Sequence, residues 1–215
     1  MKQNTVWMDQ AALWTDTAKI SPKSFKAHNN LGNMYRDAGR LDEAIVELQY
    51  ALSLYNNYFY AHHNLGIIYN KMDMFKEAFI ECQKALQINP SYPDTHNNLG
   101  LLYAKSNKLD LAVIEFTNAI LNKPDYSDAY NNLGATYIRK GLYEKAIKEC
   151  LEAIKYNDCN VDSYRNLIIA YLNNEQVDKA IEVSKKVLSL APHRSDIRNL
   201  INLIYEQKAL TNKDE

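Results

Sequence analysis

Asparagine recurs in this sequence at a fixed step of 34 residues, in a pattern suited to recognition of a peptide backbone. Its members are Asn30, Asn64, Asn98, Asn132 and Asn166, and they directly follow Asn29, His63, Asn97, Asn131 and Arg165. An asparagine side chain offers an acceptor and donors, so it can bond the C=O and N–H of an extended segment without reading its side chains. We therefore expect a peptide-binding row with low sequence preference. The alternative, which the sequence leaves open, is that these asparagines bond between neighbouring helices.

Acidic residues form a shorter series at the same step. Asp94, Asp128 and Asp162 stand four residues before the last three asparagines, at the place where the earlier copies carry Lys26 and Tyr60. A strip of carboxylates would favour a basic or hydroxyl-rich ligand. Carboxylates in the first turn of a helix also interact well with the helix dipole, and this structural role is the interpretation that we favour.

The histidines and cysteines are spaced for packing rather than for catalysis or metal binding. His28, His62 and His96 recur at the repeat step, so we expect aromatic packing at these sites. Cys82 and Cys150 are equivalent positions two copies apart, which is too far for a disulfide. The sequence contains no Ser-His-Asp set, no paired carboxylates and no phosphate-binding loop. We therefore predict a chain that is not an enzyme and that has no catalytic residues, no metal site and no cofactor.

The asparagines belong to a longer repeating phrase, Asn-Leu-Gly-x-x-Tyr, which divides the chain into hairpins. Apolar or aromatic residues occupy positions i, i+3, i+4 and i+7 of each copy, which is the pattern of one helix face. A second helix follows, with Leu109, Ala112, Phe116 and Ala119 on its buried side in the third copy, and prolines recur between copies. The predicted repeats are 25–58, 59–92, 93–126, 127–160 and 161–194. Residues 5–22 match the second half of a repeat and residues 195–209 match a capping helix, which gives a single array of twelve helices over residues 1–215.

Glycine inside a helix costs roughly 1 kcal/mol relative to alanine, so its recurrence needs a structural reason. We expect Gly32, Gly66, Gly100 and Gly134 to allow close helix–helix contact, with Ala44, Ala78, Ala112 and Ala146 as the facing small surface. The breaks between the two helices carry Gly39, Asp73, Asn107, Gly141 and Glu175, and four of these five residue types tolerate the left-handed turn that ends a helix.

Composition limits the classes of partner. The chain has 47% hydrophobic residues and a formal net charge of -1, which predicts neither disorder nor bulk attraction to nucleic acid. No stretch is apolar enough to span a bilayer and no signal peptide opens the sequence. We expect a soluble chain that is cytoplasmic by default and does not insert directly into membranes.

The combination of His or Tyr at position 4, Leu-Gly at 7 and 8, Tyr at 11, Ala at 20 and 27, and Pro at 32 resembles the tetratricopeptide repeat. The resemblance implies an all-α, right-handed superhelical α-solenoid of helix–turn–helix repeats, in which the first helices, and with them the asparagines, line a concave groove. The Asn-Asn-Leu-Gly form is most similar to the repeats of the O-GlcNAc transferase superhelix. The start of the chain, Asn4-Thr5-Val6-Trp7-Met8-Asp9, is similar to a junction in membrane-bound glycosyltransferases of the O-mannosyltransferase type.

These observations predict a non-catalytic scaffold that binds a protein or an extended peptide in the groove. One alternative is a substrate-recruiting or assembly domain of a membrane glycosyltransferase, which would be membrane-tethered and would have its catalytic region outside this chain. A second alternative is self-association into a homo-oligomer through tyrosines near the starts of the first helices, namely Tyr58, Tyr60, Tyr92 and Tyr126.

Overall fold

The computed structural model describes residues 14–190, 192–195, 198–202 and 204–205. The chain divides into two compact units, residues 1–102 (unit 1) and residues 103–215 (unit 2). The division falls inside one helix, α6 (Pro93–Lys105). The two units are described separately below.

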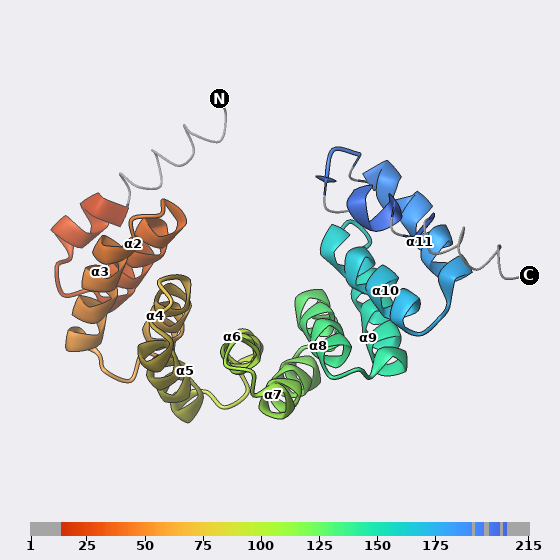
Figure 1. Cartoon of the computed structure of the whole chain (residues 1–215). Helices are drawn as coiled ribbons and strands as arrows, with labels where there is room; N and C mark the ends of the chain where they lie inside the picture. Colours follow the sequence, from red (N-terminus) through yellow and green to blue (C-terminus); the bar gives the residue numbers. More distant parts are fainter. Residues whose placement is uncertain (1–13, 191, 196–197, 203, 206–215) are drawn as a thin grey trace, which may run out of the picture. The chain divides into compact units, whose positions relative to one another are not determined.

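Helices of 13 and 14 residues alternate along the described chain (Figure 1). Besides α6 they are α2 (Phe25–Asp37), α3 (Leu41–Leu54), α4 (Phe59–Lys71), α5 (Phe75–Ile88), α7 (Leu109–Asn122), α8 (Ser127–Arg139), α9 (Tyr143–Tyr156), α10 (Val161–Asn173) and α11 (Val177–Leu190). The described residues contain no strand. In unit 1 α2 packs on α3 and α4 on α5, and in unit 2 α8 packs on α9 and α10 on α11. The predicted all-α solenoid of helix–turn–helix repeats is confirmed.

The ends of the chain are described only in part. Residues 14–20 are helical, whereas the remainder of the predicted end helix at 5–22 lies mostly outside the described residues. Residues 195, 198–202 and 204–205 are also helical, and the rest of the predicted capping helix at 195–209 lies outside the described residues.

All five turns inside the hairpins contain a residue with positive φ. The values are 76° at Gly39, 57° at Asp73, 56° at Asn107, 71° at Gly141 and 59° at Glu175. Four of these residue types were expected to tolerate the left-handed conformation. Glu175 adopts it as well, although a longer side chain is disfavoured there.

The helical glycines hold their hairpins close together, as their recurrence predicts. A Cβ atom added to Gly32 would lie 2.7 Å from Cγ of Leu48, and one added to Gly66 would lie 2.6 Å from Sγ of Cys82. Gly134 meets Sγ of Cys150 at 2.7 Å in the same way. The side chains that face the glycines therefore lie one helical turn after the alanines that were predicted to face them. The alanines contribute their backbone carbonyl groups to the contact.

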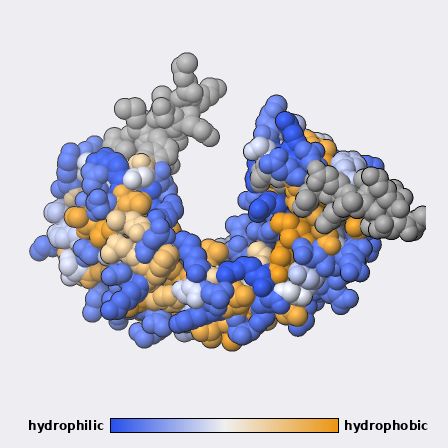
Figure 2. Space-filling view, viewed as in Figure 1, coloured by the Kyte–Doolittle hydropathy of each residue, from blue (hydrophilic) through white to orange (hydrophobic). Residues whose placement is uncertain are grey.

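Apolar residues also reach the surface, where they lie among hydrophilic residues (Figure 2). Exposed examples on the second helices are Val46, Ile80 and Leu111. None of the helices in the described part of the chain combines the length and apolar character needed to cross a bilayer.

Candidate functional site

In unit 1 the predicted asparagines bond between neighbouring first helices. Nδ2 of Asn64 on α4 donates to Oδ1 of Asn29 on α2 over 3.1 Å. Nη1 of Arg36 donates to Oδ1 of Asn64 over 3.0 Å, and Nδ2 of Asn29 donates to Oδ1 of Asn30 over 3.4 Å. Asn29 and Asn64 are only 4% and 5% exposed, while Asn30 is half-buried. The buried amides of Asn29 and Asn64 therefore connect repeats, whereas Asn30 is partly open to solvent.

The same pair of repeat positions is bonded in unit 2. Nδ2 of Asn166 on α10 donates to Oδ1 of Asn131 on α8 over 2.9 Å. Unlike Asn29 and Asn64, both side chains are half-buried rather than buried. Asn132 is half-buried on α8, and Arg165 is exposed on α10.

His63 interrupts the row of amide pairs in unit 1. Its Nδ1 atom lies 2.8 Å from Oγ1 of Thr95, and its ring meets the ring of Tyr92 edge-on at 5.1 Å. Burial lowers the pKa of His63 to about 4, so the ring is neutral at pH 7. One repeat after Asn64 and Asn29, the equivalent residues are Asn98 and His63. The Nδ2 atom of Asn98 is buried without a hydrogen-bond partner. Asn97, beside it, is buried in α6.

The three predicted acidic residues have different surroundings. Asp94 is half-buried and accepts a hydrogen bond from the hydroxyl of Tyr92, and burial together with this carboxylate raises the pKa of Tyr92 to about 12. In unit 2, Asp128 is exposed in the first turn of α8. Oδ1 of Asp162 accepts from Nη2 of Arg194 over 3.0 Å. The charge of Asp162 is thus partly neutralised by this chain itself.

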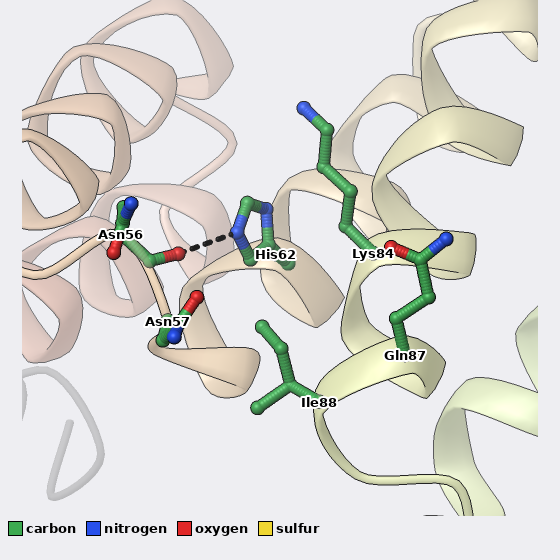
Figure 3. A pocket seen from close by; sticks show the side chains of 6 residues that line it. All are labelled: Asn56, Asn57, His62, Lys84, Gln87 and Ile88. Carbon is green, nitrogen blue, oxygen red and sulfur yellow. Dashed lines mark hydrogen bonds between the residues drawn. The ribbon is translucent and has the colours of Figure 1, made fainter.

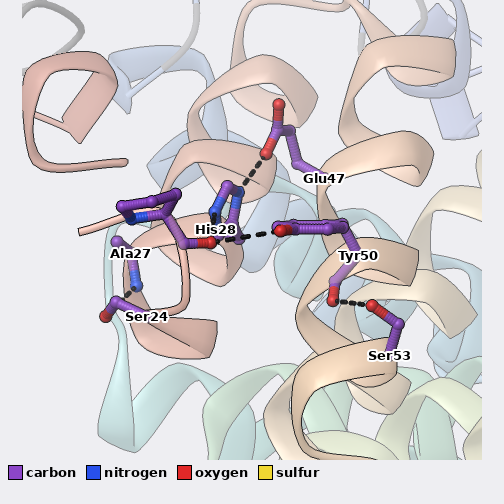
Figure 4. Close-up of polar contacts among 7 residues, drawn as sticks. Ser24, Ala27, His28, Glu47, Tyr50 and Ser53 are labelled. Carbon is purple, nitrogen blue, oxygen red and sulfur yellow. Dashed lines mark hydrogen bonds and ion pairs between the residues drawn. The ribbon is translucent and has the colours of Figure 1, made fainter. Parts of the chain in front are cut away.

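His28 and His62, both at position 4, contact glutamates of the second helix, which the sequence interpretation did not include. Nδ1 of His28 lies 2.6 Å from Oε2 of Glu47, and its Nε2 lies 3.1 Å from the carbonyl oxygen of Pro22 (Figure 4). His62 repeats the arrangement with Glu81 at 2.5 Å and the carbonyl of Asn56 at 3.0 Å. Each ring therefore connects a carboxylate of the second helix to a backbone carbonyl of the loop before the first helix.

The signal for these pairs is present in the sequence. Glu47, Glu81, Glu115 and Glu149 recur at the same 34-residue step as the histidines. The expectation of simple aromatic packing at His28 and His62 was therefore incomplete, because each ring is buried and also hydrogen-bonded on both sides. Within the described residues no group of three or more His, Cys, Asp or Glu side chains is arranged to hold a metal ion.

The fourth copy shows what happens to the glutamate when the histidine is replaced. Tyr130 stands at the histidine position and stacks on Tyr156, with ring centroids 5.6 Å apart. Burial raises the pKa of Glu149 above its usual value. Burial also acts on Glu81, but hydrogen bonds from His62 and Lys84 outweigh it and lower the pKa of that carboxyl.

A shallow pocket of about 300 Å³ lies beside His62 in unit 1 (Figure 3). Lys84, Gln87 and Ile88 line it from α5, and Asn56 and Asn57 line it from the loop between α3 and α4. The hydrogen bond from His62 to the Asn56 carbonyl fixes the position of this loop. The lining groups offer hydrogen bonds and one ammonium group, but they do not pair a nucleophile with a base.

Comparison with solved structures relates the fold to several helical-repeat proteins. A chain of the APC/C hetero-tetramer Cut9–Hcn1 has a TM-score of 0.85 and 18% identity, over 93% of this chain and 40% of that chain. PilW, a widely conserved type IV pilus biogenesis factor, has a TM-score of 0.82 and 18% identity, over 93% of both chains. YrrB, a TPR protein with an unusual peptide-binding site, has a TM-score of 0.68 and 21% identity, over 88% of this chain and 97% of that chain. At these identities the likeness concerns the fold alone.

Among curated proteins, Protein O-mannosyl-transferase TMTC1 of Homo sapiens is 36% identical over 55 residues. The matched segment is 26% of this chain and 6% of that protein, so this chain corresponds to a small part of that relative's length. The Mus musculus protein of the same name matches to the same extent.

Family models match most of the helical region. A TPR repeat model matches residues 32–73, and tetratricopeptide repeat models match residues 59–92, 81–114, 115–148 and 169–194. Together these segments cover more than half of the 215 residues. With the repeated hairpins and the likeness to solved helical-repeat structures, they show that the chain belongs to the tetratricopeptide repeat family.

Proposed function

We propose that this chain is a non-catalytic scaffold whose first helices bind an extended segment of a partner protein through asparagine side chains. The observation that carries the proposal is the 2.9 Å hydrogen bond between Asn166 and Asn131 in unit 2. It joins two half-buried amides, so it orients both of them on a surface that solvent also reaches. Preorganised polar groups of this kind bind a ligand with less loss of side-chain entropy.

The amides in this pair keep most of their hydrogen-bonding capacity. Each asparagine has two N–H donors and an oxygen with two lone pairs. The bond between Asn166 and Asn131 uses one donor of the first and one lone pair of the second. The remaining groups suit the alternating N–H and C=O groups of an extended backbone. This complementarity supports recognition of the main chain with little selection for side chains.

Burial divides the predicted site residues into two roles. We assign orientation to the buried residues Asn29, Asn64 and Asn97, with His63 in the same row. We assign ligand contact to the half-buried residues, which are Asn30 and Asn98 in unit 1 and Asn131, Asn132 and Asn166 in unit 2. Arg165 and Asp128 are exposed in unit 2, where they would add charged contacts at the margin of the peptide.

The test uses a peptide selected against the wild-type protein from a random display library. The Asn131→Ala/Asn166→Ala variant should weaken binding of this peptide about tenfold in calorimetry, because two hydrogen bonds of about 0.7 kcal/mol each are lost. Asn122→Ala is the matched control, since Asn122 is an exposed asparagine on the second helix α7 and bonds only within that helix. Unchanged affinity in the double variant, with the fold intact by circular dichroism, would refute the proposal.

The 55-residue likeness to Protein O-mannosyl-transferase TMTC1 favours one more specific candidate function. Under this second candidate, the scaffold recruits polypeptide substrates, or assembles partners, for a membrane glycosyltransferase whose catalytic region lies outside this chain. The reading frame upstream of Met1 tests it directly. Segments encoding membrane-spanning helices would support this candidate, and an upstream frame without any would count against it.

A further inference from the structure

Aromatic rings gather at the starts of the first helices in unit 1. The rings of Tyr60 and Tyr92 are nearly perpendicular, with an interplanar angle of 82° and centroids 5.7 Å apart. Phe59 contacts both of these rings, and Tyr58 meets the ring of Tyr60 at 5.6 Å. Tyr60 is 41% exposed despite these contacts. The rings of Tyr60 and Tyr92 are therefore in edge-to-face contact, and the Tyr60 side chain remains open to solvent.

A carboxylate adjoins this pair of rings. Asp94 lies two residues after Tyr92 and accepts the hydrogen bond from its hydroxyl. His63 faces the ring of Tyr92 from α4 as a neutral imidazole, so it does not place a positive charge beside the ring. The faces of tyrosine rings attract cations, and a nearby carboxylate adds to that attraction. The local charge pattern is therefore complementary to a positively charged group.

In unit 2 a lysine of the chain itself lies over the ring that is equivalent to Tyr92. Tyr126 stands at the repeat position of Tyr92, and Nζ of Lys123 lies 4.5 Å from the centroid of its ring. The residue at the position of Lys123 in unit 1 is Asn89. The two backbones match closely, with φ and ψ of -142° and 88° at Lys123 and -131° and 89° at Asn89. Unit 1 thus keeps the ring and the backbone geometry but replaces the lysine with a shorter neutral residue.

We propose that Tyr60, Tyr92 and Asp94 bind an arginine or lysine side chain of the partner segment. The inference rests on the proposed peptide-binding function and names the ligand class for unit 1. Tyr60 stands at the same repeat position as Asp94 and four residues before Asn64, so a bound cation would lie near the amides of the same first helices. Lys123 over Tyr126 is the internal precedent for the ring–cation geometry.

The experiment titrates wild-type protein with the peptide acetyl-Gly-Ser-Arg-Ser-Gly-amide and follows the tyrosine ring signals by NMR. The matched probe carries citrulline, which keeps the shape of arginine without its charge. We expect Tyr60 and Tyr92 to shift with the arginine peptide at millimolar concentration and not with the citrulline peptide. The variant Asn89→Lys should weaken binding at least fivefold, because it supplies an internal cation as Lys123 does.

Gln83→Lys controls for the added charge, since Gln83 is an exposed residue of the same helix α5. It should change the affinity less than twofold. Equal shifts with citrulline, shifts that avoid Tyr60 and Tyr92, or wild-type affinity in Asn89→Lys would each overturn the inference. A different result would refute the proposed function, namely unchanged affinity of the Asn131→Ala/Asn166→Ala variant for the selected peptide. The arginine–citrulline difference at Tyr60 is measured in unit 1 and does not depend on that variant.

Discussion

Asn64 and Asn29 are joined by a 3.1 Å hydrogen bond from the side-chain nitrogen of the first to the side-chain oxygen of the second. This bond connects α4 to α2, and Arg36 donates to the same Asn64 side chain. Asn166 and Asn131 repeat the bond in unit 2 at the same two repeat positions. Inter-helix bonding is therefore present in the row of asparagines in both units. Peptide binding by the half-buried members remains a proposal that adds to this structural role.

Replacement of Asn64 should cost more stability than replacement of Asn166. Asn64→Ala leaves the buried Asn29 amide and the Arg36 guanidinium without this partner, so we expect the free energy of unfolding to fall by about 2 kcal/mol. Asn166→Ala removes an equivalent bond at a half-buried site, where water can replace it, and should cost about 0.5 kcal/mol. Urea denaturation followed by circular dichroism gives both values. Equal losses would contradict the different roles assigned to the two residues.

Introduction of a histidine in the fourth copy should recreate the contact that His62 makes with Glu81. Tyr130→His places an imidazole opposite Glu149, and the carbonyl of Pro124 stands at the repeat position of the Pro90 carbonyl that bonds His96. The pKa of Glu149, now raised by burial, should fall below its usual value, as it does for Glu81. A ¹³C NMR titration of the Glu149 carboxyl measures this change. Tyr130→Phe is the control and should leave the pKa raised, and a raised pKa in Tyr130→His would contradict the assigned pairing.

His63 should make unit 1 sensitive to acid. Its pKa is about 4 in the folded protein and 6.5 in a free chain, so between these values the unfolded state binds a proton that the folded state does not. Its contribution to stability is therefore complete above pH 6.5 and decreases toward pH 4, by up to about 1.4 kcal/mol per pH unit. Denaturation midpoints measured from pH 7 to pH 4 test this dependence.

The variant His63→Asn isolates the effect of His63. It removes the titrating ring and restores the asparagine that most other copies carry at this position, which gives the buried Nδ2 of Asn98 a potential acceptor. We expect the loss of stability between pH 6.5 and pH 4 to be smaller in this variant than in the wild type. The same pH dependence in both proteins would show that other groups cause it.

Gly66→Ala should disturb the hairpin of α4 and α5. The added methyl group would lie 2.6 Å from Sγ of Cys82, and overpacking of this kind costs about 1–3 kcal/mol. Cys82→Ala removes the sulfur atom, and the next nearest atom, the backbone nitrogen of Cys82, is 3.5 Å away. The double variant should therefore recover part of the stability lost in Gly66→Ala. A double variant that is less stable than both single variants would contradict the steric explanation.

Much of the fold could be predicted because each local signal repeats in register. Glycine at positions such as Gly32 and Gly66 predicted close helix packing, and the turn residues predicted the left-handed conformation that all five adopt. Glu175 is the one turn residue whose type does not favour the left-handed conformation, so its backbone conformation could not be predicted from the residue type. The facing residues Leu48 and Cys82 depend on how far one helix slides along the other, which the repeat period does not determine.

The candidate site was harder to predict than the fold. The pairing of Asn64 with Asn29 connects residues 35 positions apart, and it depends on how neighbouring hairpins stack. Burial then separates Asn64 from Asn30, although the sequence places both at the same repeat position. The hydrogen bond between His62 and Glu81 was predictable in principle, because both residues recur at the same step. Such a contact is visible only when positions on the two helices of one hairpin are compared, and His62 and Glu81 are 19 residues apart.

The central claim is that half-buried asparagines recognise a peptide backbone, and modification of the bound peptide tests it most directly. Calorimetry would compare the selected peptide with one series in which each side chain is replaced by alanine and another in which each backbone nitrogen is methylated in turn. The proposal predicts small losses across the alanine series and losses of about fivefold or more at several methylated positions, where an N–H donor is removed. Large losses on alanine substitution together with tolerance of backbone methylation would contradict it.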